Sequence, residues 1–380
     1  MNEIDEIVVT GGRPLHGTVR IQGSKNTALP VMAAALLSSG TSVLRECPKI
    51  TDVFLMEKIL RELGAETWWE DHDLYLDCSH ADGTVIPEYF SGKMRSSVIL
   101  LGAMLGRNGK ARTGYPGGCV IGKRPVDLHI QVLQKLGARI VENGNEIQAT
   151  CGKLKGAEVI FPKSSVGATE QGILAAVLAE GKTVFTGCAR EPEITWLCQY
   201  LTGMGAKIEI LENPPIDEMH AILEVYRKMG GQCHRIGGKL IVNGKNAGFP
   251  LELLETDVYP GFPTDLQSPA MAVLATIPGV SRIREKIFED RYKLASWLCY
   301  MGAKIEIRDG MAVVHGGYPL RGCIVEAEEL RGGAALVIAA LAAEGVTRIR
   351  GCSFIERGYE HICEDLTALG GLLIKDRGTL

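Results

Sequence analysis

The stretch LCYMGAKIEIRDGMAVVHG, residues 298–316, holds the pattern that decides the fold. Its first residues are amphipathic and lead to Gly302, a residue type that commonly caps the C-terminal end of a helix. The residues after the glycine alternate between apolar and polar side chains, which is the period of a β-strand. The stretch therefore predicts a helix that ends at a glycine and continues into a β-hairpin.

This pattern recurs through the chain. The six copies are LRELGAETW, LQKLGARIV, LTGMGAKIE, YRKMGGQCH, LCYMGAKIE and LTALGGLLI, with their glycines at Gly64, Gly137, Gly205, Gly230, Gly302 and Gly370. A helix of small residues followed by a short strand alternates with them in five places: LPVMAAALLSSGTSVL, SSVILLGAMLGRNGKAR, EQGILAAVLAEGKTVF, AMAVLATIPGVSRI and ALVIAALAAEGVTRI. Self-similarity of this kind predicts a repeat architecture of the α/β class.

One repeat is shorter than the others. The six glycines are separated by 73, 68, 25, 72 and 68 residues. The short interval holds a single predicted helix, PPIDEMHAILEVYRKMG, which begins at Pro214-Pro215 and has no small-residue helix before it. A chain of 380 residues is long enough for two domains, and the proline pair is the best candidate for their junction.

The composition excludes several classes of protein. With 46% hydrophobic residues, 6% aromatic residues and a net charge of -4, the chain does not resemble a disordered protein, a coiled coil or a nucleic-acid binder. The eleven cysteines form no C-x-x-C motif and follow no secretory signal, which predicts a cytoplasmic location. No zinc-ligand spacing occurs, and the longest apolar runs, such as residues 333–343, are too short to span a membrane.

The segment YPGGCVIGKRPVDLH, residues 115–129, is the strongest candidate for chemistry. A glycine pair lets the chain turn sharply and present Cys119 at the tip of a loop. Lys123, Arg124 and the following helix favour the thiolate, which lowers the pKa of the thiol toward neutrality and suits it to acid catalysis or nucleophilic attack. The alternative is that Cys119 is a small buried hydrophobe, as most cysteines are.

Two further loops place polar or cationic side chains at predicted helix starts. Lys25 and Asn26, in IQGSKNTALP, would lie where amide groups and the helix dipole favour an anion, with a surface lysine as the simpler alternative. Arg95, in GKMRSSVI, would face an unfavourable dipole at its helix start, which indicates an anionic partner.

The next two loops each have a structural and a functional interpretation. Lys163, Ser164 and Ser165, in FPKSSVGATE, suit a diphosphate at a helix start, or a serine there caps the helix. Asp265, in the proline-bounded loop YPGFPTDLQSP, is either an N-cap or a general base.

Two arginines each precede a glycine, Arg331 in EELRGGAAL and Arg357 in FIERGYEHICEDL. An arginine held on a rigid turn can grip a carboxylate or a phosphate through two parallel hydrogen bonds. Surface ion pairs with the neighbouring glutamates are the alternative.

In order and wording, these loops resemble the UDP-N-acetylglucosamine enolpyruvyl transferase family, which commits that sugar nucleotide to bacterial peptidoglycan. The matching segments are GSKNTALP, PGGCVIGKRPVDLH, SVGAT, AREPEI, FPTDLQ and ERGYE, and the resemblance runs from about residue 7 to residue 375. The motif GGC-x-IG-x-RPVDLH is the most specific, because the related enolpyruvyl transferase that acts on shikimate phosphate lacks the cysteine loop.

The resemblance implies a fold and a reaction. The fold is a two-lobed inside-out α/β barrel with three repeats in each lobe; residues 21–211 would form one lobe, and 1–20 with 212–380 the other. The reaction transfers the enolpyruvyl group of phosphoenolpyruvate to the 3'-hydroxyl of UDP-N-acetylglucosamine and releases phosphate. It needs no metal and no cofactor, and its partners are these small molecules, with no nucleic acid and no membrane. The sequence does not indicate the oligomeric state.

The resemblance also implies roles for single residues. Cys119 matches the general acid that protonates the methylene carbon of phosphoenolpyruvate and that fosfomycin alkylates in this family, and Asp265 matches the residue that takes the hydroxyl proton. The cations matched to phosphoenolpyruvate are Lys25, Arg124, Arg331 and Arg357. The full set of matched substrate contacts is Lys25, Asn26, Arg95, Arg124, Pro125, Val126, Asp127, Leu128, Lys163, Ser164, Ser165, Val166, Asp265 and Ile287.

The chain departs from the family in two places. Relatives carry a small-residue helix, its flanking strands and a PDRIETG-like segment where this chain has only LENPPIDEMH, so an arginine of the family is missing. Relatives also have aspartate where this chain has Glu329, two residues before Arg331. Two alternatives therefore stand beside the main hypothesis: a catalytically impaired paralogue that binds a UDP-sugar, and an enolpyruvyl transferase with a different acceptor.

Overall fold

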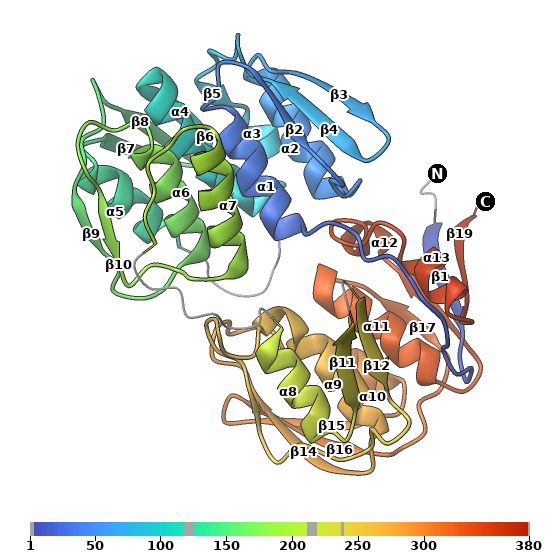
Figure 1. Ribbon diagram of the computed structural model, residues 1–380. Coiled ribbons are helices and arrows are strands. Elements are labelled where there is room, and N and C mark those ends of the chain that lie inside the picture. The colour runs from blue at the N-terminus through green and yellow to red at the C-terminus, as the bar shows by residue number, and fades with distance from the viewer. Residues whose placement is uncertain (1–3, 118–124, 211–218, 237–238, 379–380) are drawn as a thin grey trace. The chain divides into compact units, whose positions relative to one another are not determined.

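The computed structural model describes residues 4–117, 125–210, 219–236 and 239–378 (Figure 1). They form two compact units, each with its own apolar core. The first unit consists of the described parts of residues 22–119 and 124–214, and the second unit of those of 1–21 and 215–380. Helices and strands alternate through both, which confirms the predicted α/β class. We propose that these units are the two lobes that the resemblance implies.

The first unit contains three sheets, of strand order β2-β4-β3, β5-β6-β8-β7 and β9-β10. Its helices are α1 (Lys25–Ala35), α2 (Thr51–Glu62), α3 (Glu88–Ser91), the 3-10 helix η1 (Arg95–Ile99), α4 (Leu100–Asn108), α5 (Asp127–Lys135), α6 (Val166–Ala176) and α7 (Pro192–Gly203). Its strands are β2 (Thr41–Leu44), β3 (Glu66–Glu70), β4 (Asp73–Asp77), β5 (Val85–Ile86), β6 (Lys110–Gly114), β7 (Arg139–Asn143), β8 (Glu146–Thr150), β9 (Glu158–Ile160) and β10 (Val184–Thr186).

The second unit also contains three sheets, of order β11-β12, β13-β14-β16-β15 and β17-β18-β1-β19. Its helices are α8 (His220–Lys228), the 3-10 helix η2 (Thr264–Leu266), α9 (Gln267–Thr276), α10 (Leu294–Tyr300), α11 (Leu330–Ala342), α12 (Cys352–Ile355) and α13 (Ile362–Ala368). Its strands are β1 (Ile4–Thr10), β11 (Gln232–Ile236), β12 (Lys239–Asn243), β13 (Leu254–Glu255), β14 (Gly279–Arg284), β15 (Lys304–Arg308), β16 (Met311–Gly316), β17 (Ile324–Glu326), β18 (Val346–Arg350) and β19 (Leu372–Gly378).

The six cap glycines behave as the repeat predicts. All six have positive φ angles, between 91° and 111°. In each copy the residue after the glycine donates its N–H to a carbonyl in the last turn of the helix, as Ala303 does to Leu298 at 2.9 Å. This is the Schellman motif, which turns the chain out of the helix and satisfies its last carbonyls. Four of the copies confirm the predicted helix-to-hairpin unit; after Gly370 the chain forms the single strand β19, which pairs with β1, and residues 206–210 after Gly205 form no strand.

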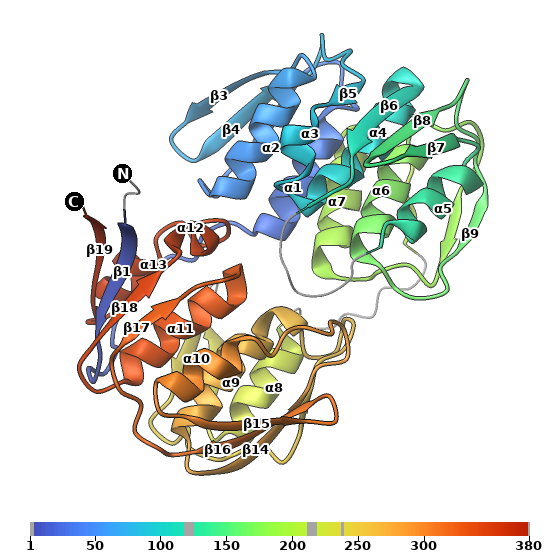
Figure 2. The same ribbon diagram turned by 180° about the vertical axis from the view of Figure 1, so that it is seen from behind.

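The three four-stranded sheets extend this unit into one common strand order. In β13-β14-β16-β15 a short strand runs parallel to the second, which pairs antiparallel with the hairpin. The sheets β5-β6-β8-β7 and β17-β18-β1-β19 follow the same order. In the last of them β1 replaces one hairpin strand, so the first and last strands of the chain lie side by side (Figures 1 and 2).

The five predicted small-residue helices are also confirmed, as η1 with α4, and as α1, α6, α9 and α11. They pack against one another, α4 on α6 and α9 on α11, while the sheets lie at the rim of each unit (Figures 1 and 2). Gly102 shows why small residues are needed, because a Cβ there would lie 2.3 Å from the carbonyl oxygen of Gln171. Among the described residues, no helix combines the length and the apolar character needed to cross a bilayer.

The shortened repeat leaves part of a sheet uncovered. Hairpin β11-β12 follows α8 without a small-residue helix among the described residues before it, and the predicted helix start at Pro214-Pro215 lies outside those residues. Leu240 and Val242 on β12 occupy the hairpin positions of Leu74 and Leu76 on β4. The latter two are 0% exposed, whereas Leu240 is 37% and Val242 59% exposed. The physical reason is that no small-residue helix among the described residues precedes α8 to cover this apolar face.

Candidate active site

Asp265 of the second unit lies between two arginines. Its Oδ2 is 2.6 Å from Nη2 of Arg331, and its Oδ1 is 3.0 Å from Nη2 of Arg291. The N-cap residues of η2 and α9 are Pro263 and Leu266, so Asp265 is not the helix cap that the simpler interpretation expected. A carboxylate flanked by two guanidinium groups is instead oriented at both oxygens.

Arg291 is a member of this group that the sequence analysis missed. It lies between β14 and α10, and its side chain is 3% exposed. Within the described residues its Nε and Nη1 have no hydrogen-bond partner, and its guanidinium lies 5.3 Å from the centre of the Phe288 ring. In the sequence it follows Glu289-Asp290, which reads as an ordinary charged surface turn.

Arg331 is held at the first turn of α11. Its Nη1 donates to the Tyr359 hydroxyl at 3.3 Å, in addition to the contact with Asp265. Burial lowers the pKa of Arg331, but the Asp265 carboxylate and Tyr359 outweigh that effect and raise it above its ordinary value. The guanidinium therefore stays charged while it is largely withdrawn from water.

Glu329 acts on the backbone of this turn. It is the N-cap of α11, and its carboxylate accepts hydrogen bonds from the N–H groups of Arg331 and Gly332. The glutamate that stands where relatives have aspartate therefore satisfies two orphan amides at the helix start.

Arg357 lies in the loop between α12 and α13, which packs on the same helix start. A Cβ at Gly358 would lie 2.9 Å from a methyl group of Leu330, so the loop approaches α11 closely, and Tyr359 contacts Arg331. The sequence neighbours of Arg357 are thus in contact with the turn that carries Arg331.

Ile287 is joined to the Asp265 turn by Glu285, a second residue that the sequence analysis missed. The Glu285 carboxylate accepts the N–H groups of Ile287 at 2.8 Å and Phe288 at 3.0 Å. Its other oxygen accepts the Thr264 hydroxyl at 2.9 Å. One carboxylate therefore fixes the Ile287 loop beside the residue that precedes Asp265.

In the first unit, Lys25 and Asn26 open helix α1. Lys25 Nζ lies 3.1 Å from Oδ2 of Asp52, a side chain that is 4% exposed in the first turn of α2. Asn26 is exposed. The surface-lysine alternative is wrong, because the side chain of Lys25 is only 16% exposed and its ammonium is paired.

The described flanks of the cysteine loop are held by the last residue of α3 and the first residue of η1. Gly117 donates its N–H to the Ser91 carbonyl at 3.0 Å, and Arg95 Nη2 donates to the Pro125 carbonyl at 2.9 Å. A Cβ at Gly117 would lie 1.8 Å from the Gly92 oxygen, so this close approach requires glycine. Cys119 and Arg124 lie outside the described residues.

The segment after this loop has two kinds of side chain. Pro125 and Asp127 are exposed, whereas Val126 and Leu128 are both 6% exposed and belong to the apolar core. Asp127 is the first residue of α5. The side chains of Val126 and Leu128 are therefore packing groups of the first unit.

The segment Lys163 to Val166 leads into α6. Ser165 occupies the N-cap position, but its side chain makes no capping hydrogen bond. Its carbonyl accepts the N–H of Thr169 at 3.0 Å, as the first bond of the helix. Lys163 is exposed, and Ser164, Ser165 and Val166 are half-buried. The hydroxyl of Ser165 is thus not used for the capping role that was the alternative interpretation.

The other cysteines contrast with the expectation for Cys119. No disulfide joins the ten cysteines of the described residues. Burial raises the pKa of Cys78, Cys198 and Cys363 to about 11, and that of Cys352 to about 12. These buried thiols stay protonated, as expected for packing residues.

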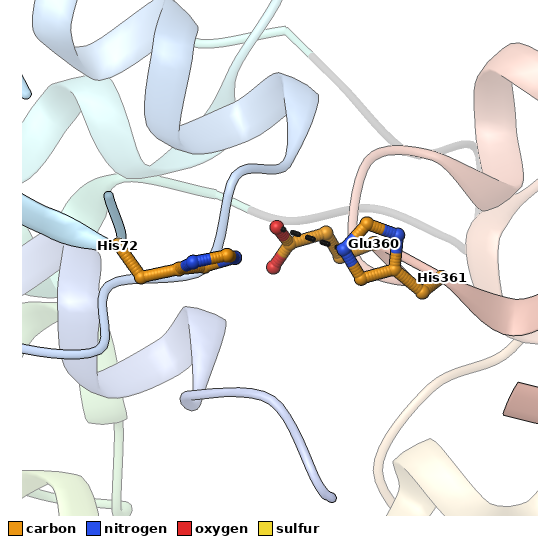
Figure 3. A group of neighbouring side chains, drawn as sticks. All are labelled: His72, Glu360 and His361. Carbon is orange, nitrogen blue, oxygen red and sulfur yellow. Dashed lines mark ion pairs between the residues drawn. The ribbon is translucent and has the colours of Figure 1, made fainter. Parts of the chain in front are cut away.

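Glu360 and His361 form an ion pair at the start of α13, with 3.3 Å between Oε1 and Nε2 (Figure 3). His72, the third side chain drawn there, belongs to the first unit. Within each unit these side chains therefore carry no argument for a metal site.

Comparison with known proteins identifies the family. The family model described as EPSP synthase (3-phosphoshikimate 1-carboxyvinyltransferase) matches residues 9–216 and 210–366. A UDP-N-acetylglucosamine 1-carboxyvinyltransferase from Wolbachia pipientis wMel is 38% identical, over 94% of this chain and 96% of the relative. The chain belongs to the UDP-N-acetylglucosamine 1-carboxyvinyltransferase family. A second member, from Carboxydothermus hydrogenoformans, is 38% identical over 97% of this chain and 98% of its own.

Solved structures show that the enolpyruvyl transferase fold extends over the whole chain. The enolpyruvyl transferase NikO from Streptomyces tendae covers 100% of both chains with a TM-score of 0.87 and 21% identity. EPSP synthase from Acinetobacter baumannii gives a TM-score of 0.71 at 16% identity. These likenesses confirm the inside-out α/β barrel. The two family-model matches overlap at residues 210–216, within the shortened repeat.

The structure therefore collects the expected enolpyruvyl transferase residues into two groups. The group of the second unit is Asp265, Ile287, Arg331 and the Arg357 loop. In the first unit, Arg95 is joined to Pro125, and Lys25 and Asn26 lie on α1, which contacts η1 and α6. Arg291 and Glu285 had no sequence signal of their own, because only their tertiary contacts distinguish them from surface residues, whereas Tyr359 stands in the ERGYE segment but was given no role.

Proposed function

We propose that this chain transfers the enolpyruvyl group of phosphoenolpyruvate to the 3'-hydroxyl of UDP-N-acetylglucosamine and releases phosphate. The observation that carries the proposal is its near-full-length similarity to 1-carboxyvinyltransferases of that acceptor. Retention of Cys119, Asp265, Arg331 and Arg357 supports it. By this proposal the enzyme works in the cytoplasm at the first committed step of peptidoglycan synthesis.

Asp265 is proposed as the acceptor of the hydroxyl proton. Arg291 and Arg331 each contact one of its oxygens, and the carboxylate is 37% exposed, so it is accessible to a substrate hydroxyl. A base must lie within hydrogen-bond reach of the proton that it takes, and the rigid pairing fixes the direction of the approach.

Phosphoenolpyruvate is proposed to bind to the cations around Asp265. Arg331 and Arg357 of the second unit act with Lys25 and Arg124, as the family motifs imply. Arg291 adds two buried donors that lack a partner within the described residues. Buried donors of this kind are expensive unless something satisfies them, and an anionic substrate with carboxylate and phosphate oxygens can do so.

The sugar nucleotide is proposed to bind to the first unit. The start of α6 offers backbone N–H groups, the Ser165 hydroxyl and Lys163 to a diphosphate. Arg95 and Asn26 supply further hydrogen bonds to the same ligand.

The reaction balances as an addition followed by an elimination. The 3'-hydroxyl oxygen bonds to C2 of phosphoenolpyruvate, Asp265 accepts the hydroxyl proton, and Cys119 gives a proton to C3. C3 then returns a proton to the Cys119 thiolate, the bond from C2 to the phosphate oxygen breaks, the proton held by Asp265 leaves with the phosphate, and the double bond between C2 and C3 re-forms. Cations placed where charge develops in the tetrahedral state lower the barrier.

The direct test incubates the protein with both substrates and measures phosphate release. The expected result is turnover in the wild type and none in Cys119→Ala. Turnover that equals the Cys119→Ala background would exclude the transferase function. A fosfomycin adduct on Cys119, sought by mass spectrometry, independently reports whether the thiol is activated.

The shortened repeat defines two other outcomes. UDP-N-acetylglucosamine binding by calorimetry without phosphate release would indicate a sugar-nucleotide-binding paralogue. Phosphate release with another UDP-sugar, but not with this one, would indicate a different acceptor. The exposed apolar face of β12 belongs to the repeat in which relatives carry additional structure, so both of these measurements are part of the experiment.

A further inference from the structure

His129 closes the RPVDLH motif but matches none of the expected substrate contacts. It lies on α5, and its ring Nδ1 forms a hydrogen bond with Oε1 of Gln171 on α6. The two residues are 5% and 0% exposed, so the bond is withdrawn from water. A buried side-chain bond between two helices fixes their relative position more strictly than apolar packing alone.

The other edge of the imidazole ring packs against the first turn of α6. A Cβ on Gly167 would lie 3.0 Å from Cε1 and 3.2 Å from Nε2 of His129. Gly167 directly follows the segment Lys163 to Val166, and His129 directly follows the segment Pro125 to Leu128. The ring therefore lies between the starts of the two helices that carry these segments.

Gln171 has an unusual environment for a residue with only a packing role. Its Nε2 is buried and has no hydrogen-bond partner within the described residues. Leaving an amide donor unsatisfied is costly, and methionine or leucine would fill similar space without that cost. Retaining an amide here indicates that its oxygen serves the bond with His129.

We propose that His129 is a positioning residue that locks the first turns of α5 and α6 into one rigid carrier for the sugar nucleotide. This inference rests on the proposed function, because it takes the matched substrate contacts at both helix starts as contacts of one sugar nucleotide. Two segments that bind one ligand must keep their spacing within a fraction of an ångström to act together. The His129 to Gln171 bond and the ring contact with Gly167 set that spacing.

Three substitutions at His129 separate hydrogen bonding from volume. His129→Asn places an amide near the position of Nδ1, His129→Gln places it near Nε2, and His129→Leu fills the space without a donor. We expect Leu and Gln to raise the KM for UDP-N-acetylglucosamine about tenfold, the effect of one buried hydrogen bond. His129→Asn should stay within about threefold of the wild type, and kcat and the KM for phosphoenolpyruvate should change less than about twofold in all three.

Val132→Ala is the matched control. Val132 lies one turn further along α5 and packs on Gly172 of α6, where a Cβ would lie 2.8 Å from its Cγ1. The substitution loosens the same pair of helices but leaves the polar bond intact. A lower Tm with an unchanged KM for the sugar nucleotide is the expected result.

A double-mutant cycle with Gly167→Ala tests the ring contact. Alanine favours a helix over glycine by about 1 kcal/mol, so the fold should tolerate the change. In the wild type it should raise the KM for the sugar nucleotide, because its Cβ displaces the ring. In His129→Asn the ring atoms Cε1 and Nε2 are gone, so the same change should have little effect.

The outcomes distinguish this inference from the proposed function. If the wild type turns over and His129→Leu keeps the wild-type KM, the inference is wrong and the function stands. If the wild type binds the sugar nucleotide without turnover, Kd from calorimetry replaces KM in the same comparisons. A protein that neither binds nor turns over would overturn both. Equal loss in His129→Leu and Val132→Ala would assign His129 a purely structural role.

Discussion

The substitution Arg291→Met should change the stability of this protein little but reduce its activity strongly. The guanidinium of Arg291 is almost fully buried, with one hydrogen bond to Asp265 and two donors that lack a partner within the described residues. Methionine has a similar volume and no polar donor. The substitution therefore removes both a favourable contact and an unfavourable burial.

The magnitudes nearly cancel. The lost bond to a charged group is worth about 1.5 to 3 kcal/mol, and the lost contact with the Phe288 ring about 0.5 to 2 kcal/mol. Relieving two unsatisfied donors returns about 1 to 3 kcal/mol each. The net change in the free energy of unfolding should lie within about 2 kcal/mol of zero. For a unit of this size that moves Tm by less than about 8 °C.

Activity should fall much further. Asp265 loses one of its two orienting cations, and the proposed anion site loses its two buried donors. A loss of about 1.5 to 3 kcal/mol in transition-state stabilisation corresponds to a fall of about 10- to 150-fold in kcat/KM. The KM for phosphoenolpyruvate should rise more than that for the sugar nucleotide.

The assays are thermal unfolding and phosphate release, with Arg284→Met as the control. Arg284 pairs with Glu255 at 3.0 Å but is 47% exposed, so its loss should change stability by less than about 1 kcal/mol and leave activity unchanged. A Tm lower by more than about 10 °C in Arg291→Met would match the 3 to 5 kcal/mol cost of breaking an ordinary buried ion pair. That result, or unchanged turnover, would refute the reasoning.

Three further predictions follow from burial, charge and capping. Leu74→Ala should cost about 2 to 5 kcal/mol by chemical unfolding and Leu240→Ala less than about 1 kcal/mol, because only the first hairpin face is covered by a helix; equal costs would contradict this account of the shortened repeat. Burial, and then the charges of two nearby glutamates, raise the pKa of Glu170 well above its ordinary 4.5, so as the pH rises past that value the unfolded state loses this proton while the folded state keeps it, and stability falls. Glu170→Gln should therefore melt together with the wild type near pH 4 and above it at pH 8, and a constant difference between these pH values would count against the burial effect. Glu329→Ala should cost about 1 to 2 kcal/mol, whereas Glu329→Asp should cost less than about 1 kcal/mol because aspartate also caps helices; similar losses would show that the cap is not the source of the stability.

The repeats could be read from the sequence because they rest on local physics. Glycine at Gly64, Gly302 and their counterparts is required by positive φ, and the alternation after it follows from the two faces of a strand. Small-residue runs likewise predict close helix packing wherever they fold. The length of the interval between Gly205 and Gly230 predicts the shortened repeat directly.

Part of the candidate site could also be found from sequence, since its motifs are contiguous. Lys25, Arg95, Asp265 and Arg331 stand in loops with glycine, proline or helix-start signals. The sequence alone could not decide between a functional role for these residues and the simpler structural one. Whether Asp265 caps a helix or meets two arginines depends on residues 26 and 66 positions away in the chain.

Only the tertiary structure decided which ordinary residues join these groups. Arg291 and Glu285 look like surface charges in sequence, and His129 looks like the end of a motif, yet all three are defined by partners from other elements. The physical reason is the sequence separation between the residues that interact. Turns, caps and periodicity are set by neighbours within a few residues, whereas burial and hydrogen-bond partners are set by which distant elements the core brings together.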